Sequence, residues 1–309
     1  MNDIAQPDSI AERPGSGLER RSLFKHAGAG LAGAAAVSAL SGGALLGSSQ
    51  NADAATAVTD ADIFNFALNL EYLESQYYLI GATGTGLPAN LTTGSVGTPG
   101  VVTGGSMVPF KSDAFLAYAQ RIAVDELAHV TFIRTVLGSA AVAQPAINLQ
   151  TSFTTLAMAA GLISAGQTFN PFADEISFLV GAYIFEDVGV TAYGGAAALI
   201  SNKTYLTAAA GILATEAYHS GAIRTILSDL GAGQATNAIS ALRAKLAGAA
   251  DDQGTLLQAP GYTNAYNFVV NDTNGLTYRR STSQVLNIVY GGTAGGGLFF
   301  PAGMNGTIK

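Results

Sequence analysis

Two segments of the chain place a histidine three residues after a glutamate, as Glu126 with His129 and Glu216 with His219. Residues with this spacing lie on one side of an α-helix, so each E-x-x-H motif presents a carboxylate and an imidazole to the same point. These are the only two histidines beyond residue 54, and the chain has no cysteine. A metal bound at these motifs would therefore have only oxygen and imidazole ligands.

A further glutamate precedes each motif, Glu71 before the first and Glu186 before the second, and both lie in apolar segments. A buried ionised carboxylate without a partner is strongly disfavoured, so paired cations would explain these surroundings. The order Glu, E-x-x-H, Glu, E-x-x-H predicts a carboxylate-bridged dinuclear metal site in a four-helix bundle. Glu74 is the alternative first ligand. Glu71 is preferred because Tyr78 follows it by seven residues, as Tyr193 follows Glu186.

In the predicted site Glu126 and Glu216 bridge two metal ions, and each ion is completed by one further glutamate and one histidine. Carboxylates with imidazole and without sulfur suit iron, our first choice, or manganese. A serine-protease type of triad would need a histidine outside the metal motifs, and none exists after residue 54. The predicted metal ligands are Glu71, Glu126, His129, Glu186, Glu216 and His219.

Other residues close to the ligands are candidates for supporting them. A metal-bound imidazole usually donates its other N–H to a carboxylate, and Asp125 and Asp187 adjoin predicted ligands. A surface cap or salt bridge is the alternative role for Asp187. Thr215 takes the place of Asp125 in the second motif, so we expect unequal half-sites. Tyr78 and Tyr193 are interpreted as core residues, with a redox role as the alternative.

The two E-x-x-H segments also resemble each other beyond the motifs. Ile133-Arg134-Thr135 after the first motif is matched by Ile223-Arg224-Thr225 after the second. This repeat indicates a duplicated helix pair, which would supply two similar half-sites. Both arginines lie two turns beyond a predicted bridging glutamate, and we expect them to form structural ion pairs.

The apolar periodicity predicts an all-α fold, a four-helix bundle over 55–248 with a long crossover. Asn170-Pro171 supplies a capping side chain and a first-position proline for the third helix. Residues 81–111 form a Gly/Thr/Pro-rich loop, and residues 249–309 a loop-rich extension that packs on the bundle through its apolar residues. The expected long helices cover 59–80, 112–137, 170–200 and 202–230, and the shorter ones 152–164, 236–247 and 281–290.

Residues 1–54 have the pattern of a twin-arginine export signal. Arg20-Arg21 precedes a long apolar run rich in Ala and Gly, and Ala52-Asp53-Ala54 supplies a small-x-small cleavage pattern. A membrane anchor is the alternative, but so weakly hydrophobic a run suits a removable segment better. We expect a periplasmic or secreted protein without a stable membrane span after removal of the signal.

The amino-acid composition excludes some classes of binding partner. Charged residues make up 11% of the chain and its formal net charge is −7, so the clustered basic residues of a nucleic-acid binder are missing. The absence of cysteine excludes disulfides, thiol nucleophiles and thiolate metal sites. The expected partners are metal ions and oxygen or peroxide, and a homo-oligomer is left open.

The sequence resembles the ferritin-like superfamily and, within it, the exported desiccation-related ferritin-like domain proteins of bacteria and plants. The resemblance covers nearly all of residues 58–309. It implies the bundle fold and iron binding, whereas the long crossovers and the tail put iron storage in a shell in doubt. The matching segments are residues 66–74, the two E-x-x-H helices, and residues 283–290 and 297–301.

The expected function is iron oxidation or peroxide removal at the dinuclear site of an exported stress-protection protein. A manganese catalase-like enzyme is one alternative. A non-enzymatic stress-protective or structural protein is the other, because the sequence shows no obvious substrate pocket.

Overall fold

The structure is a computed structural model that describes residues 58–259 and 262–309. The predicted export signal lies outside the described residues. The described residues belong to one compact unit. Its described part contains eight α-helices and two short two-stranded sheets, which confirms the all-α class.

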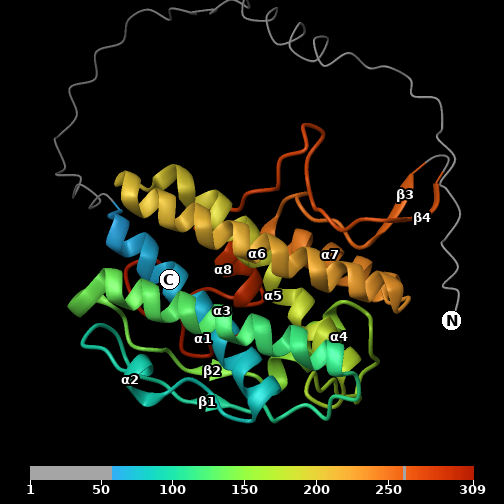
Figure 1. The fold of residues 1–309 in the computed structure, drawn as a ribbon, viewed down its shortest axis with the longest axis horizontal. Helices are drawn as coiled ribbons and strands as arrows, with labels where there is room; N and C mark the ends of the chain where they lie inside the picture. Colours follow the sequence, from blue (N-terminus) through green and yellow to red (C-terminus); the bar gives the residue numbers. More distant parts are fainter. Residues whose placement is uncertain (1–57, 260–261) are drawn as a thin grey trace, which may run out of the picture. The chain divides into compact units, whose positions relative to one another are not determined.

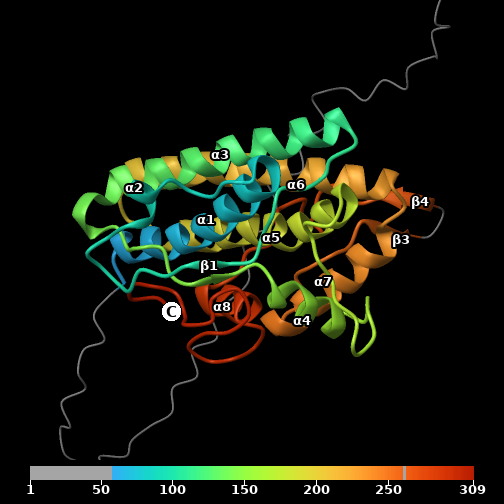
Figure 2. The same cartoon turned by 90° about the horizontal axis from the view of Figure 1, so that it is seen from below.

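Four long helices form the bundle, with α1 packed along α3 and α5 along α6 (Figure 1). Seen from below, α1 and α5 lie between the α3–α6 pair and the shorter helices α4 and α8 (Figure 2). The long helices are α1 (Asp60–Thr83), α3 (Asp113–Leu137), α5 (Glu175–Ala196) and α6 (Lys203–Asp229), and the short ones named here are α4 (Thr151–Ala159) and α8 (Thr282–Val289).

Three predicted caps begin their helices as expected. Thr59 forms a capping box at the start of α1, Ser112 accepts a hydrogen bond at the start of α3, and Asn202 does so at the start of α6. Asp60 joins two of these helix ends, because its carboxylate accepts hydrogen bonds from the backbone N–H groups of Ser201 and Asn202, each at 2.8 Å.

The predicted start of the third helix at Asn170-Pro171 is wrong. Asn170 accepts a hydrogen bond from the N–H of Phe172 and so stabilises a turn. Helix α5 begins four residues later, where the Asp174 side chain accepts from the N–H groups of Ile176 and Ser177. Asn170 and Asp174 are both suitable capping residues, and the helix starts at the second of them.

Two further helix limits differ from expectation. Gly81 continues α1, which ends only at Gly84 with φ 77°. A Cβ on Gly81 would lie 2.3 Å from the ring of Phe178, so this glycine permits close packing of α1 on α5. The linking helix α4 ends at Ala159, short of the expected residue 164.

Helix α5 is buried on all sides, which accounts for its apolar sequence. Among the described residues it is the one helix long and apolar enough to cross a membrane, but 89% of that stretch is buried within the protein. A helix that is apolar all round is typical of the core of a larger assembly of helices.

The connecting segments contain structure that the sequence did not predict. The 84–112 segment includes α2 (Ala89–Thr92) and β1 (Val102–Thr103), and β1 pairs in parallel with β2 (Ile147–Asn148). Beyond α7 (Gly233–Ala247), β3 (Leu256–Ala259) pairs antiparallel with β4 (Tyr262–Tyr266).

The final segment of the chain packs on the bundle near α8. The ring of Phe299 contacts those of Phe153 on α4 and Phe185 on α5, with centroid distances of 5.2 and 4.9 Å. Phe300 is fully buried as well. These aromatic contacts join the final segment to α4 and α5.

Candidate metal centre

All six predicted ligand side chains meet in one buried cluster, to which each long helix contributes. Glu71 comes from α1 and Glu186 from α5, while α3 and α6 each supply one complete E-x-x-H pair. The four glutamates are at most 1% exposed, and His129 and His219 are 8% and 6% exposed. The three-residue spacing therefore places both motifs on the inner faces of their helices, as predicted.

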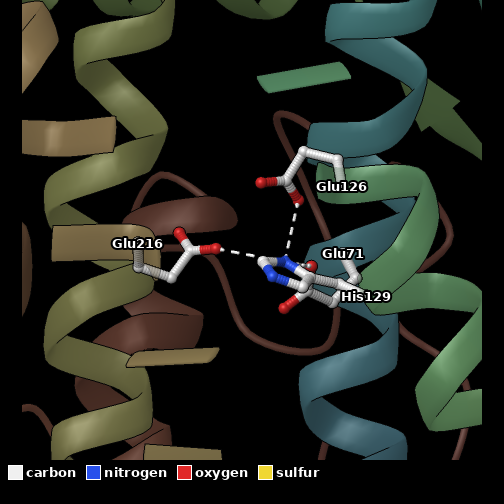
Figure 3. Close-up of side chains that lie close together, drawn as sticks. All are labelled: Glu71, Glu126, His129 and Glu216. Atoms are coloured by element: carbon white, nitrogen blue, oxygen red, sulfur yellow. Dashed lines mark hydrogen bonds and ion pairs between the residues drawn. The ribbon is translucent and has the colours of Figure 1, made fainter. Parts of the chain in front are cut away.

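Three carboxylates surround the imidazole of His129 (Figure 3). Its Nδ1 lies 3.2 Å from Oε2 of Glu71, 3.7 Å from Oε2 of Glu126 and 3.4 Å from Oε1 of Glu216. One potential ligand atom from each of these four residues lies within 4.8 Å of the others. The group has the composition and size of a single-ion site.

A second group forms around His219. Its Nδ1 lies 3.4 Å from Oε1 of Glu126 and 3.3 Å from Oε2 of Glu186. Glu126 thus contributes to both groups, one oxygen toward each histidine, whereas Glu216 belongs to the first group alone. The arrangement gives Glu126 the position of a bridging carboxylate.

Several of these atoms are buried without a hydrogen-bond partner in the described part of the chain. They are both carboxylate oxygens of Glu126 and of Glu216, Oε2 of Glu186 and Nδ1 of His219. Leaving a buried polar atom unpaired costs about 1–3 kcal/mol, so such atoms rarely gather without a ligand. Their convergence fits a bound cation, and an oxygen and imidazole set fits iron or manganese.

The pKa values of the cluster show how strongly negative charge is concentrated there. Burial opposes protonation of both imidazoles, but nearby carboxylates outweigh it, chiefly Glu71 for His129 and Glu186 for His219. They raise the pKa of His129 to about 10 and that of His219 to about 11. Burial, with the charges of neighbouring glutamates, holds the pKa of Glu216 well above its ordinary value. The cluster therefore strongly favours the binding of positive charge.

Two tyrosines bind the outer carboxylates of the cluster. Tyr78 on α1 donates a hydrogen bond to Oε1 of Glu186 on α5, and Tyr193 on α5 donates one to Oε1 of Glu71 on α1. Each tyrosine thus supports the glutamate of the other half of the repeat. Both side chains are buried core residues that also contact the site.

Asp125 on α3 supports a histidine of the cluster, but this is His219 on α6 and not the histidine of its own helix. Its Oδ2 lies 3.2 Å from Nε2 of His219, and Arg121 in turn binds both oxygens of Asp125. Of the two roles considered for Asp187, the salt bridge is confirmed and the contact with an imidazole is wrong. Its carboxylate accepts from Ser220 instead, and it pairs with two buried arginines.

The two repeated arginines play different roles. Arg224 forms the expected structural ion pair, 2.9 Å from Asp187. The expectation for Arg134 is wrong, because it donates to the hydroxyl of Tyr72 and the carbonyl of Thr93. The repeated arginines therefore do not make the same contact in the two halves of the repeat.

Glu74 is buried near the cluster but lies in neither group of potential ligand atoms. Burial, with the charges of Glu126 and Glu71, raises its pKa well above the ordinary value.

Gly189 is a further residue of the site that was not predicted from the sequence. A Cβ at this position would lie 2.3 Å from Oε2 of Glu216, so the carboxylate occupies the space that glycine leaves. The position of this glycine, one turn after Glu186, could have indicated close packing at the site.

Comparison with known proteins agrees with this geometry. The profile of the ferritin-like domain matches residues 59–229, more than half of the chain. The chain belongs to the ferritin-like domain family. This membership confirms the resemblance inferred from the E-x-x-H helices.

Two curated proteins are similar to this ferritin-like chain over most of their length. It is 26% identical over 270 residues to the ferritin-like catalase Nec2 of Nesocodon mauritianus, covering 81% of this chain and 84% of that protein. It is 28% identical over 247 residues to the desiccation-related protein PCC13-62 of Craterostigma plantagineum, covering 74% and 76%. No solved structure gives a significant match.

Proposed function

We propose that the cluster binds two metal ions, iron as first choice and manganese as the alternative, and that the protein removes hydrogen peroxide with them. The observation that carries the proposal is the convergence of unpartnered, buried carboxylate oxygens on two imidazoles. Two redox-active ions, when bound, would supply the electron exchange with peroxide. Catalase-type turnover converts two H₂O₂ into two H₂O and one O₂, so it needs no other co-reactant.

The residues of the chain have separate parts in this proposal. Glu126 would bridge the ions, since it faces both histidines. Glu216 is the second bridging candidate, although its present position favours the side of His129. Glu71 and Glu186 would each offer one oxygen, because a tyrosine occupies the other.

Burial and protonation set the conditions for binding. Every carboxylate of the proposed ligand set is almost fully buried, which strengthens its attraction for a cation. An ion that binds Nδ1 of either histidine must displace a proton from the imidazole, since metal ligation needs the neutral ring.

Similarity to a protein named as a catalase favours peroxide removal over simple iron oxidation. Similarity to a desiccation-related protein favours a role in stress protection, which a non-enzymatic, metal-stabilised scaffold could also perform. We further propose that the chain is exported to the periplasm or secreted, on the strength of its twin-arginine motif.

Oxygen evolution tests the proposed activity. The full chain is reconstituted anaerobically with Fe(II) or Mn(II), given hydrogen peroxide, and followed with an oxygen electrode. We expect about one O₂ for every two H₂O₂ consumed, lost in Glu126→Gln/Glu216→Gln and retained in Glu175→Gln, which changes a glutamate outside the cluster. Peroxide-dependent Fe(II) oxidation without O₂ would support the iron-oxidation alternative. A metal-dependent gain in Tm without peroxide loss would support the scaffold.

A further inference from the structure

We propose that the two metal positions are unequal, and that the half-site of His219 and Glu186 fills first and binds its ion more tightly than the half-site of His129 and Glu71. The inference rests on the proposed dinuclear site and adds an order of filling to it. A difference between the half-sites on the outer side of the imidazoles supports it.

The difference is the support of the imidazole ring. Nε2 of His219 lies 3.2 Å from Asp125, and Arg121 fixes that carboxylate with a 2.9 Å hydrogen bond from its Nε. With Nε2 held in this way, Nδ1 is directed at Glu126 and Glu186. A carboxylate partner fixes the ring and makes the other nitrogen a stronger ligand.

His129 lacks this support. By the internal repeat its partner would be Thr215, the counterpart of Asp125, but the Thr215 hydroxyl donates to the carbonyl of Gly211 at 3.3 Å. Within the described ranges Nε2 of His129 makes no hydrogen bond. The repeat has thus kept both histidines but only one carboxylate partner.

Inside the cluster the two half-sites are alike. Nδ1 of His129 lies 3.2 Å from Oε2 of Glu71, and Nδ1 of His219 lies 3.3 Å from Oε2 of Glu186. A tyrosine hydroxyl donates to Oε1 of each of these glutamates. The support on the outer side of the imidazole therefore distinguishes the half-sites.

Solvent access does not offset this difference. His129 and His219 are similarly buried, at 8% and 6% exposure, so neither half-site is much more open to solvent. His129 has one additional carboxylate neighbour inside the cluster, Glu216 at 3.4 Å. The proposed order gives the support of His219 by Asp125 more weight than this additional carboxylate.

Stepwise loading with Mn(II) tests the inference by electron paramagnetic resonance, with isothermal titration calorimetry in parallel. The metal-free full chain receives Mn(II) in steps under anaerobic conditions. We expect the signal of an isolated Mn(II) ion to grow up to one equivalent per chain. The second equivalent should then replace it with the signal of a coupled pair.

Two variants assign the order to particular residues. Asp125→Asn should weaken the first binding step by about 10–100-fold and bring the two steps together. Thr215→Asp, which gives His129 a potential partner, should strengthen the second step. Asp229→Asn is the control, because it removes an exposed carboxylate from the end of α6.

The possible failures are distinguishable. A coupled-pair signal already dominant below one equivalent, or an unchanged first step in Asp125→Asn, would overturn the unequal half-sites while leaving the dinuclear site standing. Absence of Mn(II) binding in the unaltered chain would overturn the dinuclear site and this inference together.

Discussion

The hydroxyl of Tyr193 on α5 donates a hydrogen bond to Oε1 of Glu71 on α1. The bond crosses between the two halves of the repeat, and Tyr78 and Glu186 form its counterpart in the opposite direction. Each pair holds one carboxylate oxygen and leaves the other directed at a histidine. The tyrosines therefore orient the outer carboxylates of the cluster.

Removal of one such hydroxyl should weaken metal binding. Tyr193→Phe keeps the buried ring but frees Oε1 of Glu71, so we expect affinity for the ion beside Glu71 to fall by about tenfold or more. Calorimetric titration with Mn(II) measures the change. Tyr205→Phe is the control, since its ring packs on Phe64 away from the cluster. Equal affinities in the two variants would argue against the orienting role.

The space at Gly189 should be needed for Glu216. In Gly189→Ala the new Cβ would lie 2.3 Å from Oε2 of Glu216, so the carboxylate must move and metal stoichiometry should drop. Gly211→Ala on α6 meets nothing within 4 Å and provides the matched control. It should keep its metal and gain about 0.5–1 kcal/mol of stability, as is usual for this change within a helix. Full metal content in Gly189→Ala would contradict the expectation.

A buried ionic network should stabilise the packing of residues 251–252 against the bundle. Arg243 lies 2.6 Å from Asp187 on α5 and 2.8 Å from Asp252. Removing one partner of a buried ion pair leaves an uncompensated charge, so Arg243→Met should lower the free energy of unfolding by about 3–5 kcal/mol.

Urea denaturation of the metal-free protein measures this loss. Arg279→Met, which removes the same charge from an exposed residue, should cost at most about 1 kcal/mol. Similar losses in the two variants would show that the network adds no more than a surface charge does.

The link between the starts of α1 and α6 should depend on pH. Backbone hydrogen bonds from Ser201 and Asn202 lower the pKa of Asp60 below its ordinary value of 3.8. A lowered folded-state pKa stabilises the fold above the ordinary value, and this contribution is lost as pH falls through the folded pKa. Asp60→Asn should therefore have a lower urea midpoint than the unaltered chain at pH 7, and the gap should close on acidification. A gap that stays constant down to pH 3 would refute this.

The cluster was largely predictable because its information is local. Three-residue spacing alone places Glu126 and His129 on one helix face, and the scarcity of histidine makes the motifs conspicuous. Contacts between helices were harder to predict from the sequence. The Asp125–His219 contact joins α3 to α6, and the burial of Asp187 beside Arg243 depends on how residues beyond the bundle pack.

Competing local signals account for the main error in the fold. Asn170-Pro171 and Asp174 both offer a helix start, and the sequence gives no energy difference between them. Two side-chain hydrogen bonds at Asp174 identify the real start in the structure. The short strands β1 and β2 escaped prediction because their partners, such as Val102 and Ile147, are far apart in the sequence.

Metal content tests the central proposal most directly. Mature protein exported by its own host is analysed for iron and manganese beside its Glu126→Gln/Glu216→Gln variant. The proposed site predicts about two ions of iron or manganese per chain and their loss from a variant that remains folded by circular dichroism. Protein without metal that also takes up none on anaerobic reconstitution, or a variant that keeps both ions, would contradict the account.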